Sequence, residues 1–209
     1  MREFAKDYLK ILTTDLAGLN LTRILDEEEF YQKQIVDSVL PAQESPIFRE
    51  KIEKSEIIVD IGFGGGFPIL PLAHFFKEKR FVGFEARGKK ATAVTSIAQK
   101  LKIDNARLFH QRFEEIEFDK TAVLTFKAVA TIPELLSQIT ATTQISVFFY
   151  KGPSVFEQED IASTEKQWKM IENRKISVPS VENRTLLGFE NRNVLRGTHK
   201  KLAKISEFF

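Results

Sequence analysis

A glycine-rich stretch between an apolar strand and a helix is the feature that most constrains this fold. The β-branched run Ile57–Val59 is typical of a buried parallel strand, and it leads directly into Asp60–Pro68, which reads DIGFGGGFP. Gly62, Gly64 and Gly66 let the backbone turn sharply and approach a ligand without an intervening Cβ. Ligands of open α/β sheets bind beyond the carboxyl ends of the strands, so this stretch predicts a binding site there.

The residues around the glycines limit the class of ligand. A dinucleotide fingerprint would need glycine where this chain has Phe67, and no Gly-Lys-Ser/Thr of a phosphate-binding loop is present. Asp60, at the end of the strand, favours a cationic or hydroxyl-rich ligand over a pyrophosphate. The next strand ends at Glu85, whose carboxylate can accept hydrogen bonds from both hydroxyls of a ribose. These features predict a pocket for an adenosine without a diphosphate, which S-adenosylmethionine fits best.

Strands and helices alternate along the rest of the middle of the chain. Strands are predicted at 80–85, 106–110, 122–126 and 145–150, and helices at 69–76, at 89–100 and from Pro133 onward. This alternation predicts an α/β fold, a doubly wound and mainly parallel sheet, with a helical amino-terminal extension. We expect one domain, residues 1–209, with a helical cap at 1–50, a cofactor-binding core at 56–155 and a carboxyl-terminal helix and strands at 156–209 that complete the sheet.

The two ends of the chain carry weaker signals. Near the amino end, Asp26 and Glu29 have the spacing of a helix-capping pair, and Pro41 is predicted to end that helix. Trp168 is predicted to pack a helix onto the sheet. The tail predicts a hairpin with strands near 175–178 and either 185–189 or 194–196.

Composition excludes several classes of chemistry. The chain has no cysteine, so disulfides, thiolate-bound zinc, iron–sulfur clusters and a cysteine nucleophile are all excluded. Its three histidines lack metal-ligand spacing, and we predict no metal site. Because there is no apolar run of about 18 residues and no signal-like amino end, we expect a cytoplasmic monomer without membrane contact.

Seven short blocks of sequence occur in an order that points to a family. They are NLT at 20–22, KQIVDS at 33–38, the loop at 60–68, GKK at 88–90, RFEE at 112–115, KAVA at 127–130 and KG at 151–152. In these blocks the chain resembles the ribosomal RNA small subunit methyltransferase G family, also called glucose-inhibited division protein B. The resemblance covers about residues 15–155 and weakens in the tail.

The resemblance implies a Rossmann-like fold of the class I S-adenosylmethionine-dependent methyltransferase type. It also implies that the product is 7-methylguanosine in a decoding-region loop of 16S rRNA. Its partner would be 16S rRNA or the small ribosomal subunit. Glu85 would hold the ribose, Gly62 and Phe67 would line the methionine and adenosine side, and Phe113 and Glu114 would flank the adenine. The complete set of predicted cofactor-binding residues is Asp60, Gly62, Gly64, Gly66, Phe67, Glu85, Phe113, Glu114 and Lys127.

Three positions depart from the family's pattern. Gln34 stands where histidine is common, Phe63 where a small polar residue is usual, and Lys127 where arginine is usual. Lys127 keeps the positive charge but lacks the planar donor fork of arginine. This change bears on cofactor affinity.

The implied reaction agrees with the residues that the chain has. Nitrogen 7 of guanine attacks through a lone pair and carries no proton, so alignment and water exclusion can supply most of the rate without a general base. We therefore predict no catalytic residue, with Lys127 and Arg112 positioning the substrate. The common route to methylation at carbon 5 of cytosine needs a cysteine, and 127–130 lacks the Asp/Asn-Pro-Pro-aromatic motif of enzymes that methylate exocyclic amines.

Basic residues follow the predicted strands. The overall charge of +2 conceals an acidic first third, with 8 basic and 13 acidic residues in 1–60, and a basic remainder. Basic residues after strands would share one rim of the sheet and fit a phosphate backbone. The predicted RNA-binding residues are Arg87, Lys89, Lys90, Arg112 and Lys151.

Two other functions fit parts of the pattern. A class I methyltransferase acting on a small molecule or a protein would keep the glycine loop and Glu85 but would give the basic rim no role. A non-catalytic RNA-binding or ribosome assembly factor would keep the fold and lose the cofactor. A nicotinamide dehydrogenase is disfavoured by Phe67.

Overall fold

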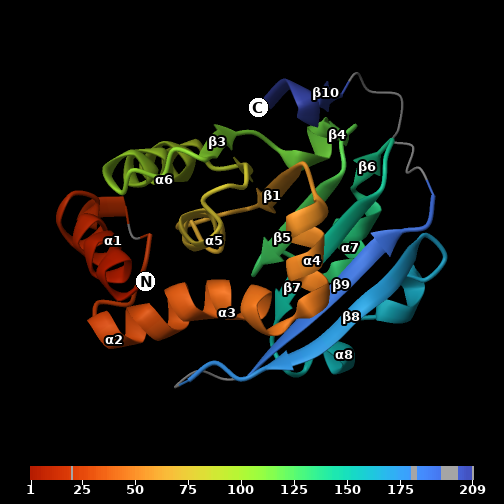
Figure 1. Ribbon diagram of the computed structural model, residues 1–209, viewed down its shortest axis with the longest axis horizontal. Coiled ribbons are helices and arrows are strands. Elements are labelled where there is room, and N and C mark those ends of the chain that lie inside the picture. Colours follow the sequence, from red (N-terminus) through yellow and green to blue (C-terminus); the bar gives the residue numbers. More distant parts are fainter. Residues whose placement is uncertain (20, 180–182, 194–201, 209) are drawn as a thin grey trace.

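The main sheet confirms the predicted α/β architecture. A computed structural model describes residues 1–19, 21–179, 183–193 and 202–208. Its seven-stranded sheet has the order β3-β2-β1-β5-β7-β9-β8, in which β3, β2, β1, β5 and β7 pair parallel and β9 pairs antiparallel with β7 and with β8 (Figure 1). The chain order changes direction between β1 and β5, which is where ligands bind in such sheets.

The observed elements lie close to the predicted ones. The strands of the main sheet are β1 (Ile57–Ile61), β2 (Phe81–Glu85), β3 (Ala106–His110), β5 (Ala122–Lys127), β7 (Ile145–Lys151), β8 (Trp168–Ile176) and β9 (Arg184–Asn191). The helices are α1 (Arg2–Thr14), α2 (Glu27–Phe30), α3 (Asp37–Glu44), α4 (Pro46–Lys54), α5 (Ile69–Phe75), α6 (Gly88–Lys100), α7 (Ile132–Ser137) and α8 (Val155–Gln158). Among these helices, none combines the length and apolarity that crossing a membrane requires.

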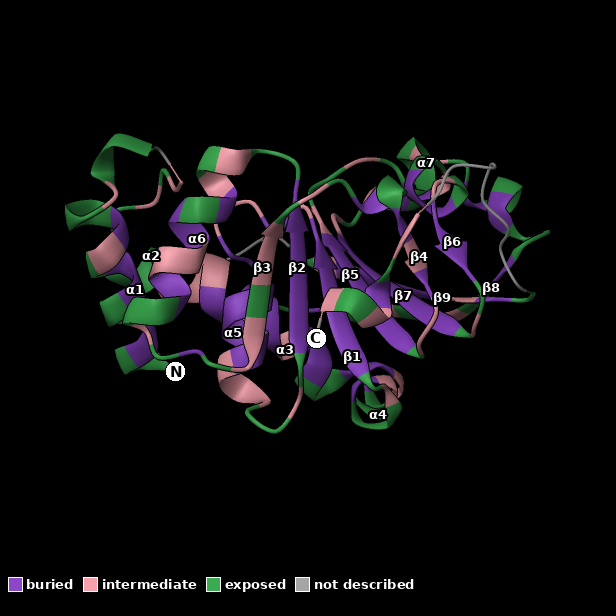
Figure 2. Ribbon diagram, turned by 90° about the horizontal axis from the view of Figure 1, so that it is seen from above, coloured by how far each residue is buried: buried purple, intermediate pink, exposed green. Residues whose placement is uncertain are grey.

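The two faces of the sheet are covered differently. Successive side chains point to opposite faces, so Ile58 and Val123 pack under helices α1 and α3–α6, whereas Val59 and Leu124 belong to the cluster on the other face. That second face is covered by α7 and by a small parallel sheet of β10 (Ala203–Lys204), β4 (Ile116–Phe118) and β6 (Thr140–Ala141). Figure 2 shows the central strands buried and edge strand β3 partly exposed. The sequence did not predict the small sheet, because strands of two or three residues show no periodicity.

The prediction for the amino-terminal helices is half right. The Asp26 side chain accepts a hydrogen bond from the Glu29 amide and caps α2, as predicted. The prediction that Pro41 ends the helix is wrong, because the chain continues through a π-helix at Tyr31–Val36 and through α3 to Glu44. Pro41 removes only its own N–H, and its carbonyl still accepts from the Ser45 amide.

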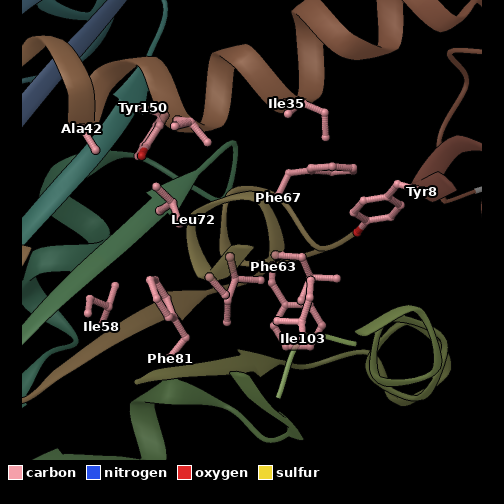
Figure 3. Packing of buried hydrophobic residues seen from close by; sticks show 14 of the residues in the cluster. Tyr8, Ile35, Ala42, Ile58, Phe63, Phe67, Leu72, Phe81, Ile103 and Tyr150 are labelled. Carbon is pink, nitrogen blue, oxygen red and sulfur yellow. The ribbon is translucent and has the colours of Figure 1, made fainter. Parts of the chain in front are cut away.

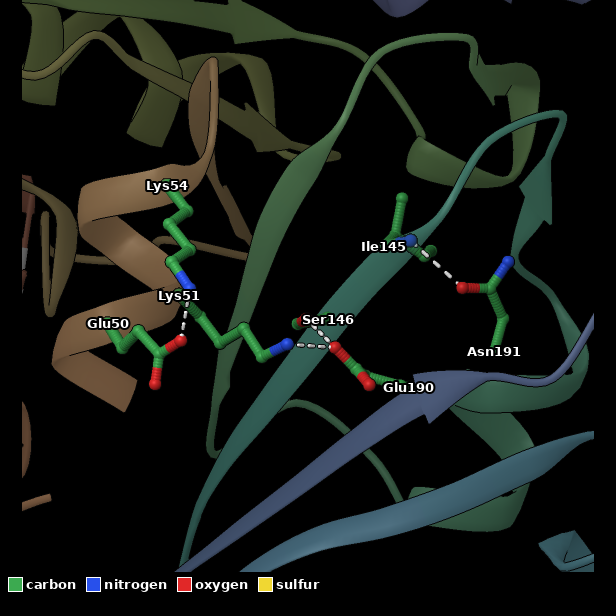
Figure 4. A network of polar contacts seen from close by, with 7 residues as sticks. All are labelled: Glu50, Lys51, Lys54, Ile145, Ser146, Glu190 and Asn191. Carbon is green, nitrogen blue, oxygen red and sulfur yellow. Dashed lines mark hydrogen bonds and ion pairs between the residues drawn. The ribbon is translucent and has the colours of Figure 1, made fainter. Parts of the chain in front are cut away.

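The tail forms the first of the two predicted hairpins. Strands β8 and β9 pair antiparallel, whereas the alternative at 194–196 lies outside the described residues. Trp168 begins strand β8 and is buried in the apolar cluster that also holds the inner face of α7. Glu190 ties β9 to the rest of the fold: it pairs with Lys51 of α4 and accepts from Ser146 of β7 (Figure 4).

Candidate functional site

A large cavity opens at the carboxyl ends of β1, β2 and β5. Its volume is about 890 Å³, within the range of pockets that hold a cofactor-sized ligand. The predicted site residues that line it are Gly62, Gly64, Phe67, Glu85, Arg87, Lys90, Arg112, Phe113, Glu114 and Lys127. Asp60, Gly66, Lys89 and Lys151 do not line the cavity. The structure therefore brings together most of the residues that were chosen from the sequence.

The glycine loop, residues 60–68, has backbone angles at its glycines that other residues adopt only at a cost in free energy. Gly62 and Gly64 have φ of 69° and 54°, in the left-handed region. A Cβ on Gly62 would lie 2.9 Å from Val129 Cγ2, so the loop after β5 leaves no room for a side chain there. A Cβ on Gly64 would lie 3.8 Å from the Gly62 carbonyl oxygen, an ordinary van der Waals contact, so here the backbone angle and not a lack of space favours glycine. The unusual Phe63 is buried beside Gly83 of β2, where it fills the space that the missing side chain leaves.

Glu85 joins β2 to the glycine loop. Its Oε2 accepts a hydrogen bond from the Gly64 amide at 3.0 Å, and its Oε1 accepts from the Arg87 amide at 2.9 Å. A carboxylate has about four acceptor positions, so about two remain for a ligand. Glu85 is only 7% exposed, and it still lines the cavity. It can therefore order the loop and accept from ligand hydroxyls at the same time.

Asp60 supports the loop from beneath. Its side chain is 1% exposed and accepts from the Ile69 amide, at the start of α5, and from Thr125 Oγ1 of β5 at 2.8 Å. Burial raises the pKa of Asp60 to about 7 against the lowering effect of these two hydrogen bonds. Asp60 is thus placed to connect β1, α5 and β5 rather than to contact a ligand in the cavity.

The opposite wall of the cavity contains a buried ionic cluster, which we call the Asp37 cluster: Asp37, Lys127 and Arg184. Asp37 Oδ2 lies 2.7 Å from Lys127 Nζ, and Asp37 Oδ1 accepts from Arg184 Nε at 2.7 Å. Asp37 is fully buried, whereas Lys127 and Arg184 line the cavity. Burial lowers the pKa of Lys127 and the neighbouring Asp37 carboxylate raises it. One carboxylate between two cations leaves a net positive charge on this wall.

The remaining basic residues divide into two groups. Arg87, Lys90 and Arg112 line the cavity, at the starts of α6 and of the turn after β3. Lys89 is exposed outside the lining. Lys151 Nζ pairs with Glu159 Oε1 at 2.7 Å and donates to the Ala130 carbonyl, so it holds internal segments together. The predicted single rim of basic residues is therefore smaller than the sequence suggested.

Comparison with known proteins identifies the family. The family model described as rRNA small subunit methyltransferase G matches residues 1–188. The chain belongs to this family. The protein named Ribosomal RNA small subunit methyltransferase G from Mesoplasma florum is 31% identical over 163 residues, 76% of this chain and 66% of that protein. A protein of the same name from Streptococcus pyogenes is 33% identical over 138 residues, 64% of this chain and 56% of that protein. The matched stretch thus spans between about half and two thirds of these relatives.

Solved structures show the same fold at low sequence identity. The mitomycin 7-O-methyltransferase MmcR superposes with a TM-score of 0.57 at 14% identity, covering 88% of this chain and 60% of that chain. A mutant of MtNAS superposes with a TM-score of 0.54 at 16% identity, covering 90% of this chain and 74% of that chain. The neighbours establish a class I methyltransferase fold for this family member.

Several residues that line or support the cavity were not predicted from the sequence. Asp37 lies in the KQIVDS block that carries the resemblance, and a carboxylate in such a block was a usable signal. Arg184 lies 147 positions further along the chain, beyond the short blocks that carry the resemblance although within the matched residues 1–188, and nothing local marks it. Leu21 and Ile24, which precede α2, also line the cavity. They show that the amino-terminal segment forms part of the wall.

Proposed function

We propose that the protein transfers a methyl group from S-adenosylmethionine to ring nitrogen 7 of a guanine in 16S rRNA. The observation that carries this proposal is the pairing of two unlike walls in one cavity of a rRNA small subunit methyltransferase G family member. One wall is the glycine loop with Glu85, and the other is the cationic Asp37 cluster.

The residues on the first wall suit the methyl donor. Glu85 keeps acceptor capacity for ribose hydroxyls, and Gly64 lines the cavity without a side chain that would keep a ligand from the backbone. Phe67 and Phe113 supply apolar lining and Glu114 stands beside Phe113. These residues would bind the cofactor, which supplies an activated methyl group on its sulfonium.

The reaction needs alignment more than proton transfer. A bond forms between guanine nitrogen 7 and the methyl carbon as the bond from that carbon to sulfur breaks, and the electron pair of the broken bond stays on sulfur. The positive charge moves from the sulfonium to the guanine ring, and no proton leaves. Holding the two reactants in line and excluding water accounts for catalysis, so this chain's residues act by positioning.

The second wall and the cavity edge suit an RNA. Arg87, Lys90 and Arg112 are available at the edge, and the net positive charge of the Asp37 cluster lies inside it. Cations of this kind bind phosphates, which position a nucleic acid without reading its sequence. We propose 16S rRNA, free or within the small ribosomal subunit, as the partner.

Transfer of a labelled methyl group tests the proposal directly. Purified protein is incubated with labelled S-adenosylmethionine and either small ribosomal subunits, naked 16S rRNA or, as a control, naked 23S rRNA, and the nucleosides are separated after digestion. We expect 7-methylguanosine from one of the two 16S substrates and none from the control. Label in another nucleoside or in protein, or no transfer at all, would refute the proposed reaction.

A further inference from the structure

We propose that Tyr8, on the amino-terminal helix α1, is a positioning residue of the cofactor site that holds the glycine loop in its binding shape. The inference rests on the proposed function, because it assumes that the loop binds S-adenosylmethionine. It extends that function to helix α1, which contributes no residue to the cavity lining and whose Tyr8 lies 57 positions before Gly65 in the sequence.

Tyr8 reaches the loop with its only polar atom. The side chain is fully buried, and its hydroxyl donates to the Gly65 carbonyl at 2.6 Å. Burial raises the pKa of Tyr8 well above its usual value, which keeps the hydroxyl protonated and able to donate. A buried donor that loses its acceptor is left unsatisfied, which is costly. The hydrogen bond therefore fixes the direction of the Gly65 carbonyl.

The ring of Tyr8 also contacts Phe67, near the end of the loop. Tyr8 stacks on Phe67 with ring centroids 5.0 Å apart and planes 24° apart, and Phe30 packs edge-on against both rings. Figure 3 shows the two stacked side chains, with the Tyr8 hydroxyl directed toward the loop after β1. Phe67 itself lines the cavity. Tyr8 thus contacts two parts of the site, the Gly65 carbonyl and the Phe67 ring.

The missing side chain at Gly66 leaves room for the Tyr8 hydroxyl. Gly66 has φ of 92°, and a Cβ on it would lie 2.2 Å from Tyr8 Oη. A Cβ on Gly65 would lie 2.9 Å from the Leu21 carbonyl oxygen, so a second part of the amino-terminal segment also packs tightly on the loop. Gly66 does not line the cavity, and its requirement for glycine comes from this contact as well as from its backbone angle.

The loop is therefore held from two sides. Glu85 accepts from the Gly64 amide on the β2 side, and Tyr8 donates to the Gly65 carbonyl on the α1 side. The next amide, of Gly66, donates to the Phe63 carbonyl at 2.7 Å and closes the turn. Removal of the Tyr8 hydroxyl leaves one side free, and a loop that samples other shapes binds its ligand less tightly.

A pair of matched variants tests the inference. Tyr8→Phe removes the hydroxyl and keeps the ring. Tyr150→Phe is the control, because Tyr150 is also buried and donates to a backbone carbonyl at 3.1 Å, but that carbonyl belongs to Ser38 of α3 and not to the glycines of the loop. The full-length variants are titrated with S-adenosylhomocysteine by calorimetry and unfolded with urea. We expect both to lose stability, and Tyr8→Phe alone to bind about tenfold more weakly, with Tyr150→Phe within about twofold of the wild type.

A double-mutant cycle measures whether Tyr8 and Gly66 affect cofactor affinity jointly, which a general loss of stability would not produce. Gly66→Ala is measured in the wild type and in Tyr8→Phe. Because Phe lacks the atom that the new Cβ would meet, we expect Gly66→Ala to weaken binding less in the Tyr8→Phe background.

Three results would overturn the inference. They are unchanged affinity in Tyr8→Phe, an equal loss in Tyr150→Phe, or strict additivity in the cycle. A wild-type protein that binds no S-adenosylhomocysteine would instead overturn the proposed function, and this inference with it.

Discussion

The two walls of the cavity are built by opposite means. On the Glu85 wall, backbone amides of Gly64 and Arg87 bind one carboxylate, and all three residues lie within a short stretch around β1 and β2. On the Asp37 wall, three charged side chains from α3, β5 and β9 meet, with 147 residues between Asp37 and Arg184. The hydrogen bonds of Glu85 join two neighbouring segments of the chain, whereas the Asp37 cluster forms only when α3, β5 and β9 are all in place.

This difference predicts different consequences of mutation. A change on the Glu85 wall removes contacts to the cofactor and leaves the distant parts of the fold untouched. A change at Asp37 leaves two partly buried cations without their carboxylate and separates elements that the fold joins. The following predictions test whether mutations on the two walls have these different consequences.

Glu85→Ala is expected to have the largest effect. It removes the acceptor for ribose hydroxyls and also frees the Gly64 and Arg87 amides, so two kinds of interaction are lost together. We expect S-adenosylhomocysteine to bind at least about 100-fold more weakly by calorimetry. Glu78→Ala, an exposed position just before the same strand, is the control and should bind like the wild type. Near-normal binding by Glu85→Ala would show that the ligand does not lie against this wall.

Asp37→Asn tests the second wall. It keeps the shape of the side chain and removes the charge between Lys127 and Arg184, and loss of one partner from a buried ionic cluster costs about 3 kcal/mol of unfolding free energy. We expect urea unfolding to show this loss and RNA methylation to fall, while affinity for S-adenosylhomocysteine changes less than threefold.

The matched control for Asp37→Asn is Glu190→Gln. Glu190 also pairs with a cation, Lys51, and also ties β9 to a helix, but it lies outside the cavity lining and is more exposed. We expect a loss of about 1 kcal/mol and normal methylation. If Asp37→Asn lowered cofactor affinity as strongly as Glu85→Ala, the two walls would not be separate in function.

The same contrast explains what could be predicted from the sequence. The glycine loop, Glu85 and the strands of the parallel core follow from local patterns: glycines after a β-branched run, a carboxylate at the end of the next strand, and alternating strand and helix lengths. Arg184 could not be found in this way, because its partner lies in another part of the chain. Tyr8 likewise belongs to an unremarkable helical pattern, and only the fold places its hydroxyl on Gly65.

Errors in the fold prediction have equally specific causes. Pro41 was expected to end a helix, but a single missing N–H is tolerated where the flanking turns remain bonded. Strands β4, β6 and β10 are too short for a period to be visible, so the cover of the second face was not predicted. Asp60 was predicted to bind the cofactor, but it is buried, accepts from Ile69 and Thr125 and does not line the cavity.

Asp60→Asn tests this supporting role through pH. The pKa of the folded carboxyl is about 7 and the reference value is 3.8, so the native state holds the proton more tightly than the unfolded state. The resulting stability is fully present below about pH 3.8 and is lost as the pH rises toward 7. Through Asp60, the free energy of unfolding should fall by about 1.4 kcal/mol per pH unit, which amounts to about 2 kcal/mol between pH 5 and 6.5. The Asp60→Asn variant should not show this fall. Parallel urea unfolding curves at the two pH values measure it, and identical slopes for both proteins would refute this assignment.

The smallest expected effect separates two neighbouring lysines. Lys90 lines the cavity and Lys89 is exposed outside its lining, although they are adjacent in α6. If RNA enters over the cavity edge, Lys90→Ala should weaken RNA binding about threefold at moderate salt and reduce the salt slope by about 0.7, the value for one phosphate contact of a single strand. Lys89→Ala, the matched control, should change neither. Fluorescence anisotropy of a labelled 16S fragment over a salt series measures both variants. Equal effects would mean that the exposed face of α6, and not the cavity edge, contacts the RNA.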